Sequence, residues 1–183
     1  YMATVAKAAS FIVLARLVAV SLSFIIDQFD LFFGAVVILS VLAGALFATN
    51  QTDLKRLIAY SGVIQSAFIL SGIVSGVNGT SASLFYITAY TIQLIGIFTI
   101  FTIISGKLSS DFSIENLSGL FVENKFLTIC FSIFMLGLAG IPLTSGFISK
   151  FILITNLWSY ESYVLVVILM LSMFSLKAFA IDA

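Results

Sequence analysis

Long apolar runs separated by short polar breaks dominate the chain. Apolar residues fill runs near 2–26, 31–49, 55–75, 83–105, 126–158 and 163–179. A run of about 20 apolar residues crosses the hydrocarbon core of a bilayer once as an α-helix. The breaks contain turn-forming residues, such as the glycine and asparagine cluster at 76–80. The pattern predicts an all-α integral membrane protein, with about six transmembrane helices in a single domain over residues 1–183.

The fifth run, 126–158, is too long for one straight membrane helix. It contains Pro142, the only proline of the chain, flanked by Gly140 and Gly146. Proline supplies no N–H and clashes with the carbonyl four residues earlier, and glycine permits non-helical backbone. We therefore predict a helix that is discontinuous at Pro142, with Gly140, Pro142 and Gly146 as its hinge. Unwound backbone at membrane depth occurs where it is buried in protein or lines a wet cavity, so we expect function here.

Composition supports a lipid solvent and excludes several kinds of site. The chain is 61% hydrophobic and 9% charged, and its mean hydropathy is +1.23. It has no histidine, and its one cysteine, Cys130, lies inside an apolar run, so we expect no metal site, disulfide or redox motif. The formal net charge is zero, so no basic surface favours nucleic acid. The sequence begins at Tyr1 within an apolar run that already carries a charge. We therefore expect it to be a piece of a longer chain.

The basic residues between the apolar runs fall on one side of the membrane. Alternating the breaks across the membrane places cations on one face and only acids on the other: Lys55, Arg56, Lys107, Lys125 and Lys177 against Asp27, Asp30 and Glu161. By the positive-inside rule the first face is cytoplasmic, or the matrix or stromal face of an organelle. We expect a multi-pass protein of a bacterial inner membrane, with an organellar inner membrane as the alternative.

Three cations remain inside apolar runs: Lys7, Arg16 and Lys150. A charge at membrane depth costs at least about 2.5 kcal/mol, so each needs a partner or water. Lys150 lies about 12 Å of helix past Pro142, too deep for easy snorkelling. The hydroxyls of Thr144 and Ser149 and freed carbonyls near Pro142 would hydrate it. A buried lysine can switch between its charged and neutral forms, which suits proton transfer; the alternative is a structural lysine held by those carbonyls.

Lys7 and Arg16 are half a turn out of phase, so they point to opposite sides of their helix. Small residues around Lys7 allow close helix approach and favour a buried, functional lysine over one at the interface. For Arg16 a structural role is favoured.

Lys55 has two interpretations that the residues leave open. It follows Asp53 at the start of a run, as a cation at the membrane interface would. Polar residues continue inward from it as Tyr60, Ser61 and Gln65, which would hold a chain of waters. The later cluster around Tyr86, Tyr90 and Gln93 is typical of hydrogen bonding between helices.

Two stretches resemble a known family. Residues 50–61 (NQTDLKRLIAYS) and 138–151 (LAGIPLTSGFISKF) are similar to stretches of the antiporter-like membrane subunits of respiratory complex I, and 141–147 is most similar to the subunit N branch. Residues 5–9 resemble that family's eighth helix, and the similarity covers the whole chain. It implies half of an antiporter-like inverted-repeat bundle in which Lys7, Lys55 and Lys150 line a proton path. Relatives often carry a histidine near position 65, where this chain has none.

The resemblance implies a subunit of NADH:quinone oxidoreductase that translocates protons while electrons pass from NADH to quinone elsewhere. The chain itself would hold no cofactor, and NADH, FMN, iron–sulfur clusters and quinone would be used by other subunits. Its partners would be neighbouring antiporter-like complex I subunits, the lipid bilayer and protons. Two alternatives remain: a subunit of a sodium/proton antiporter or hydrogenase-linked ion pump of the same ancestry, and a membrane scaffold that transports nothing.

Overall fold

A computed structural model describes residues 2–21, 26–49, 51, 53–105 and 124–182, and the side chains of all of these except 2, 3, 26–28, 105 and 174–182. Its regular elements are helices: a π-helix at Met2–Ala6, α1 (Lys7–Val20), α2 (Ile26–Ala48), α3 (Leu54–Val74), α4 (Gly76–Ser105), α7 (Lys125–Ala139), α8 (Ser145–Ser159) and α9 (Tyr163–Asp182). The predicted all-α fold is confirmed.

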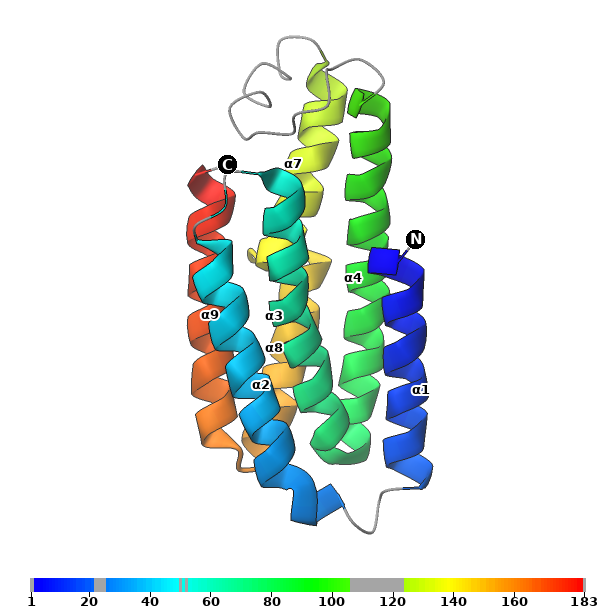
Figure 1. Ribbon diagram of the computed structural model, residues 1–183, viewed down its shortest axis with the longest axis vertical. Coiled ribbons are helices and arrows are strands. Elements are labelled where there is room, and N and C mark those ends of the chain that lie inside the picture. Colours follow the sequence, from blue (N-terminus) through cyan, green and yellow to red (C-terminus); the bar gives the residue numbers. More distant parts are fainter. Residues whose placement is uncertain (1, 22–25, 50, 52, 106–123, 183) are drawn as a thin grey trace.

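The helices run along the length of one bundle (Figure 1). Helix α3 lies inside it and contacts α2, α4 and α8, while α4 also contacts α1 and α7, and α9 packs against α2 and α8. Helices α7 and α8 follow one another along the bundle axis, so together they form the discontinuous fifth helix that the sequence predicts.

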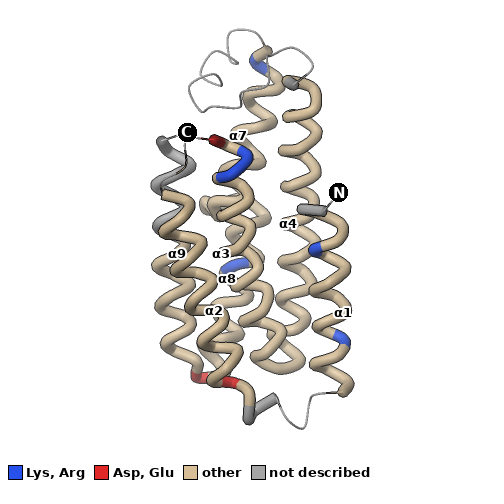
Figure 2. The backbone as a smooth tube through the Cα atoms, viewed as in Figure 1, with Lys and Arg blue, Asp and Glu red and all other residues tan. Residues whose placement is uncertain are grey.

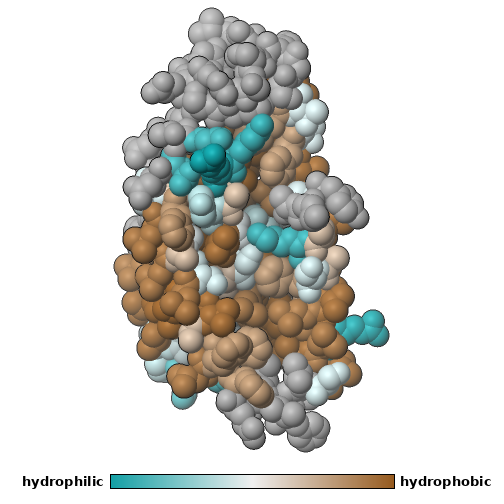
Figure 3. Space-filling view, viewed as in Figure 1, coloured by the Kyte–Doolittle hydropathy of each residue, from teal (hydrophilic) through white to brown (hydrophobic). Residues whose placement is uncertain are grey.

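Three of the described helical stretches are long and apolar enough to cross a membrane: Phe29–Ala48, Leu54–Val74 and Gly76–Ile104. The helices Lys125–Ala139 and Tyr163–Met173 are apolar but shorter. Large apolar side chains remain exposed on the bundle, Leu31 (88%) and Leu39 (65%) among them, as expected where lipid is the solvent. Figure 3 shows hydrophobic side chains over the middle of one face, with hydrophilic ones gathered toward the end where α3 begins.

Two apolar clusters bury successive parts of α3. One packs its second half against α2, α4, α8 and α9 through residues such as Val37, Phe68, Leu153 and Leu169. The other packs its first turns against α4 and α7 through residues such as Leu57, Leu94, Ile97 and Leu138. Because α3 is enclosed along its length, its buried polar residues face protein and must find hydrogen-bond partners there.

Several predicted boundaries were wrong. Helix α4 begins at Gly76 and not near 83, because the connection from α3 is a single residue, Ser75, followed by Gly76 with φ of 88°. The turn-forming cluster that follows is helical, and the hydroxyls of Thr80 and Ser81 donate to carbonyls four residues earlier.

At the other end of the bundle, α2 begins at Ile26 and not at 31, so Asp30 belongs to the helix and not to a loop. The first predicted run, 2–26, ends earlier, since α1 stops at Val20. Lys107 and the side chains of Asp27 and Lys177 lie outside what the structure describes.

Candidate functional site

The break between α7 and α8 contains two of the three predicted hinge residues, Gly140 and Pro142. Gly140 caps α7 with φ of 76°, and its N–H donates to the carbonyls of Leu136 (3.0 Å) and Gly137 (3.1 Å). Thr144 caps α8, where its hydroxyl oxygen accepts the N–H of Phe147 at 3.3 Å. Pro142 lies between the two caps.

Gly146 has a different role from Gly140. A Cβ at Gly146 would collide with the carbonyl oxygen of Gly137, so glycine is needed there for the two half-helices to approach closely. Gly146 is thus a packing contact on α8, and Gly140 is where the backbone turns.

Pro142 leaves the carbonyl of Leu138 without its helical donor, because that donor would be the N–H of residue 142. Two side chains replace it. The ammonium of Lys150 donates to the Leu138 oxygen at 2.8 Å, and the amide nitrogen of Gln65 donates to the same oxygen at 3.1 Å. The break in the helix therefore creates the acceptor that binds the buried lysine.

Lys150 is 1% exposed, although it carries an ammonium group. Its Nζ lies 5.4 Å from the centre of the Phe68 ring, in cation–π range. A Cβ at Gly140 would lie 3.1 Å from Lys150 Cδ, so the lysine stem fills the space beside this glycine. Protein encloses Lys150 at the level of the break.

Gln65 extends this cluster to helix α4. Its side-chain oxygen accepts a hydrogen bond from the hydroxyl of Tyr86, and both residues are buried. One amide thus joins α3 to α7 through Leu138 and to α4 through Tyr86.

Lys7 makes a similar contact on the other side of α3. Its Nζ donates to the carbonyl of Gly62 at 2.9 Å, and the hydroxyl of Ser66 donates to the same oxygen at 2.7 Å. A Cβ at Gly62 would lie 3.1 Å from both Lys7 Nζ and the Tyr90 hydroxyl, so these groups gather around this glycine.

Together these groups form what we call the central polar row. Hydrogen bonds link the groups at each end of this row. Its two tyrosines, in the middle, are one helical turn apart on α4. Its members are Lys7, the Gly62 carbonyl, Tyr90, Tyr86, Gln65, the Leu138 carbonyl and Lys150. The row lies inside the bundle, between two of the three predicted lysines.

The structure places Lys55 apart from this row. Lys55 is exposed in the first turn of α3, about 15 Å of helix from Gln65. Its N–H donates to the capping carboxylate of Asp53 at 2.9 Å, and Asp53 also lies 3.9 Å from Arg56 Nε. Arg16 is likewise exposed, on α1, whereas Lys7 is partly buried.

Most of the other predicted water-path residues use their hydroxyl hydrogens within their own segment. Ser61 donates to Ile58, Ser149 to Ser145 and Gly146, and Thr144 to Ile141. The ring of Tyr60 stacks on Phe47, with centroids 5.6 Å apart. Of that group, Gln65 alone joins the central polar row.

The predicted hydrogen bonding between helices is found at Tyr86, whose hydroxyl donates to Gln65 of α3. The spacing of four places Tyr86 and Tyr90 on one face of α4. Sequence reasoning missed the contribution of Asp30. Asp30 was interpreted as a loop charge, yet its carboxylate accepts the Tyr160 hydroxyl at 3.2 Å.

Charged side chains lie toward both ends of the bundle (Figure 2). Lys55 and Arg56 at the start of α3 and Lys125 at the start of α7 lie at one end, where Asp53 pairs with Arg56, and Asp30 and Glu161 lie at the other end. In the described residues no group of three or more His, Cys, Asp or Glu side chains is placed to hold a metal ion.

A bundle of apolar helices with a broken helix and a buried lysine defines a class of multi-pass membrane protein, and comparison identifies the family. Residues 1–175 match the family model described as NADH:quinone oxidoreductase/Mrp antiporter, TM. The chain belongs to this family of membrane proteins, and the resemblance drawn from residues 50–61 and 138–151 is confirmed.

Curated relatives carry the name of one complex I subunit. The chain is 39% identical over 156 residues to NADH-quinone oxidoreductase subunit N of Mycobacterium tuberculosis, covering 82% of this chain and 29% of that protein. It is 34% identical over 167 residues to the chloroplastic NAD(P)H-quinone oxidoreductase subunit 2 of Mesostigma viride, covering 91% and 33%. The chain therefore spans about a third of the length of these relatives.

Solved structures share the fold. A chain of respiratory complex I from Thermus thermophilus with bound NADH superposes with a TM-score of 0.76 at 24% identity, covering 86% of this chain and 33% of that one. A chain of the Mrp complex from Dietzia sp. superposes with a TM-score of 0.73 at 26% identity, covering 93% and 32%.

Proposed function

We propose that this chain forms part of a proton-translocating membrane subunit of NADH:quinone oxidoreductase, and that residues 1–183 form one translocating domain. Electron transfer from NADH to quinone, with FMN and iron–sulfur clusters, belongs to other subunits. This proposal makes the protein part of a translocase without redox chemistry in this chain. Its partners are the neighbouring antiporter-like subunits, and its place is a bacterial inner membrane.

The observation that carries the proposal is the binding of Lys150 to the Leu138 carbonyl that Pro142 leaves free. The same oxygen also accepts a hydrogen bond from the Gln65 amide. If Lys150 lost its proton, the Leu138 oxygen would therefore still have a donor. A change in the charge of Lys150 therefore need not leave a buried acceptor unpaired, which lowers the cost of switching. The central polar row then offers Lys7 as the second titratable cation, reached through Gln65, Tyr86 and Tyr90.

Lys55 enters this proposal as a residue at the mouth of the path. It is exposed at the cation-rich end of the bundle, where protons from the cytoplasmic side would enter. Tyr60 and Ser61 lie one to two turns further along α3, between Lys55 and Gly62.

The test uses the complete subunit in its assembled complex, reconstituted in vesicles. Protons pumped per NADH oxidised are compared for Lys150→Met and for the matched control Lys125→Met, which removes an exposed cation. Lys150→Met should lower the number of protons pumped per NADH by the number that passes through this subunit. Lys125→Met should leave that number unchanged. Normal pumping by assembled Lys150→Met complex refutes the proposal and favours a structural lysine.

A further inference from the structure

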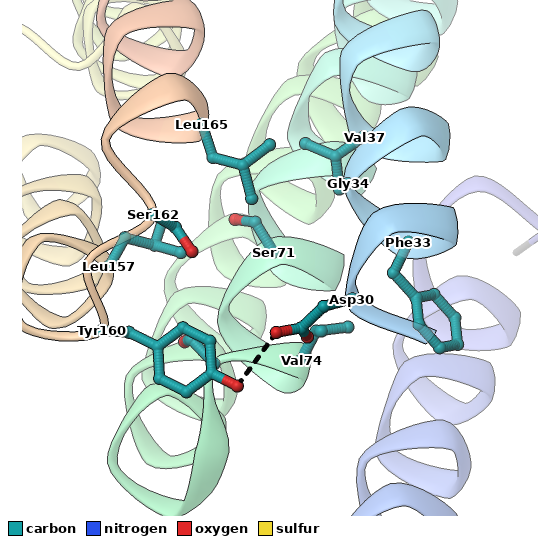
Figure 4. Close-up of a pocket in the computed structure, with 11 residues that line it drawn as sticks. Asp30, Phe33, Gly34, Val37, Ser71, Val74, Leu157, Tyr160, Ser162 and Leu165 are labelled. Carbon is teal, nitrogen blue, oxygen red and sulfur yellow. Dashed lines mark hydrogen bonds between the residues drawn. The ribbon is translucent and has the colours of Figure 1, made fainter. Parts of the chain in front are cut away.

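A cavity opens between α2, α3 and the turn that joins α8 to α9 (Figure 4). It lies at the end of the bundle opposite Lys55, because the start of α2 and the end of α8 meet there. About 50 Å³ of it is open to the centres of water molecules, which is space for roughly three to four waters. Its polar lining consists of Asp30, Ser71, Ser75, Tyr160 and Ser162.

Only one of the two oxygens of the Asp30 carboxylate has a hydrogen-bond partner in the protein. Its Oδ2 accepts the hydroxyl of Tyr160 at 3.2 Å. Its Oδ1 is buried and has no hydrogen-bond partner, and it is the one buried side-chain polar atom in this state among the described residues. A buried carboxylate oxygen requires a donor, and water or a small cation is the usual answer where the protein gives none.

The neighbouring hydroxyls do not supply that donor. Ser71 donates its hydrogen to the carbonyl of Phe68 at 2.8 Å, and Ser75 donates to Gly72 at 3.0 Å. Their oxygens therefore remain as acceptors beside Asp30. A cavity with several acceptors and one negative charge suits water that carries a proton.

The cavity follows Lys150 in the direction of the acidic end of the bundle. Leu157, in its lining, is seven residues past Lys150 on α8, which is about 10 Å of helix. Phe68 and Leu153, both 0% exposed, lie along α3 and α8 between the two. This apolar layer separates Lys150 from the cavity.

We propose that the cavity is a proton-release site in which Asp30 accepts the proton that leaves Lys150. The inference rests on the proposed function. In this step water enters the apolar layer and carries the proton from the Lys150 ammonium, which becomes a neutral amine, to the Asp30 carboxylate, which becomes a carboxylic acid. The acid then gives the proton to water outside and returns to the carboxylate, and no electron moves. The Tyr160 hydroxyl holds the carboxylate in place.

The titratable groups that face this site are few. Asp30 and Tyr160 are the ionisable side chains of the cavity lining, and α3 contributes only hydroxyls to it. Glu161, next to Tyr160 in sequence, is exposed and outside the lining. It offers a matched control of the same charge at the same end of the bundle.

The experiment compares Asp30→Asn with Glu161→Gln in the complete subunit, in assembled complex in vesicles. Asp30→Asn should lose as many protons per NADH as Lys150→Met, and Glu161→Gln should lose none. In difference infrared spectra, acidifying the outer side should raise a carboxylic acid band that is missing in Asp30→Asn and present in Glu161→Gln. Asp30→Glu, which keeps a carboxylate, should restore at least part of the pumping.

The outcomes separate this inference from the proposed function. If Lys150→Met stops pumping while Asp30→Asn pumps normally, the release site is refuted and the proposed function stands. If Asp30→Asn does not assemble, Asp30→Glu replaces it, because the acid band of a glutamic acid differs in position from that of an aspartic acid. A carboxylic acid band that does not shift in Asp30→Glu refutes the site equally. A cavity that binds sodium without any carboxylic acid band also overturns it.

Discussion

Replacing Gln65 with leucine tests whether the side-chain amide of Gln65 stabilises the packing of α3 against both α4 and the break between α7 and α8. Gln65 is 1% exposed and makes two hydrogen bonds to other helices, one to the Leu138 carbonyl and one from Tyr86. Leucine has a similar size and makes neither bond. The Leu138 oxygen would keep Lys150, whereas the buried Tyr86 hydroxyl would lose its acceptor.

The expected magnitude follows from hydrogen bonds between membrane helices, which contribute about 0.6 kcal/mol on average and at most about 1.7. Two lost bonds lower the free energy of unfolding by about 1–3 kcal/mol. With Tyr86→Phe already in place, Gln65→Leu removes only the Leu138 bond. The two substitutions should therefore show a coupling energy of about 0.6–1.7 kcal/mol.

Unfolding of the complete subunit by sodium dodecyl sulfate in mixed micelles measures this double-mutant cycle. The control cycle pairs Gln65→Leu with Thr99→Val, because the hydroxyl of Thr99 is exposed and donates only to Ile95 of its own helix. The control should be additive. Additivity within about 0.5 kcal/mol for the Gln65 and Tyr86 pair as well contradicts the link described here.

Three further substitutions test other parts of the site. Gly140→Ala places a side chain at φ of 76° against Lys150 and should lower the free energy of unfolding by at least about 1–2 kcal/mol, measured in the same micelles; an unchanged midpoint contradicts it. Thr144→Ala removes the cap of α8 and should cost about 0.5–2 kcal/mol in that assay, whereas Thr144→Ser should restore the stability. Lys7→Met removes the donor to Gly62 and should reduce the protons pumped per NADH without loss of assembly; an unchanged ratio excludes Lys7 from the path.

The break in the helix was predictable because its causes are local. A single proline inside an overlong apolar run, with glycine two residues before it, determines where helical hydrogen bonds fail. The structure confirms the interruption, with α7 ending at Ala139 and α8 beginning at Ser145.

The partners of the freed carbonyl were not predictable, because they depend on packing between distant segments. Gln65 reaches Leu138 across 73 positions of sequence. Nothing in the composition of α3 distinguishes this glutamine, which bonds two other helices, from Ser61, whose hydroxyl donates to its own helix. Choosing between them requires the rotation of α3 within the bundle.

Asp30 shows how a charge at the edge of an apolar run misleads. Such a charge indicates the end of a membrane helix, so the sequence pattern predicts that Asp30 lies in a loop. In the fold its helix continues to Ile26, and its carboxylate meets Tyr160, which is 130 positions away. The short turn at Gly76 was misjudged for a related reason, since glycine and asparagine favour turns but do not prevent a helix enclosed by neighbours.

The most direct test of the central claim is the ratio of protons pumped to NADH oxidised in assembled complex that carries Lys150→Met. The hydrogen bond from Lys150 to the Leu138 carbonyl is the part of the structure that connects the broken helix to the proposed proton transfer. We predict that electron transfer continues and that the ratio falls by the number of protons that this subunit contributes per NADH. A ratio equal to that of the unsubstituted complex would contradict the proposed path and make the buried lysine a structural support of the helix break.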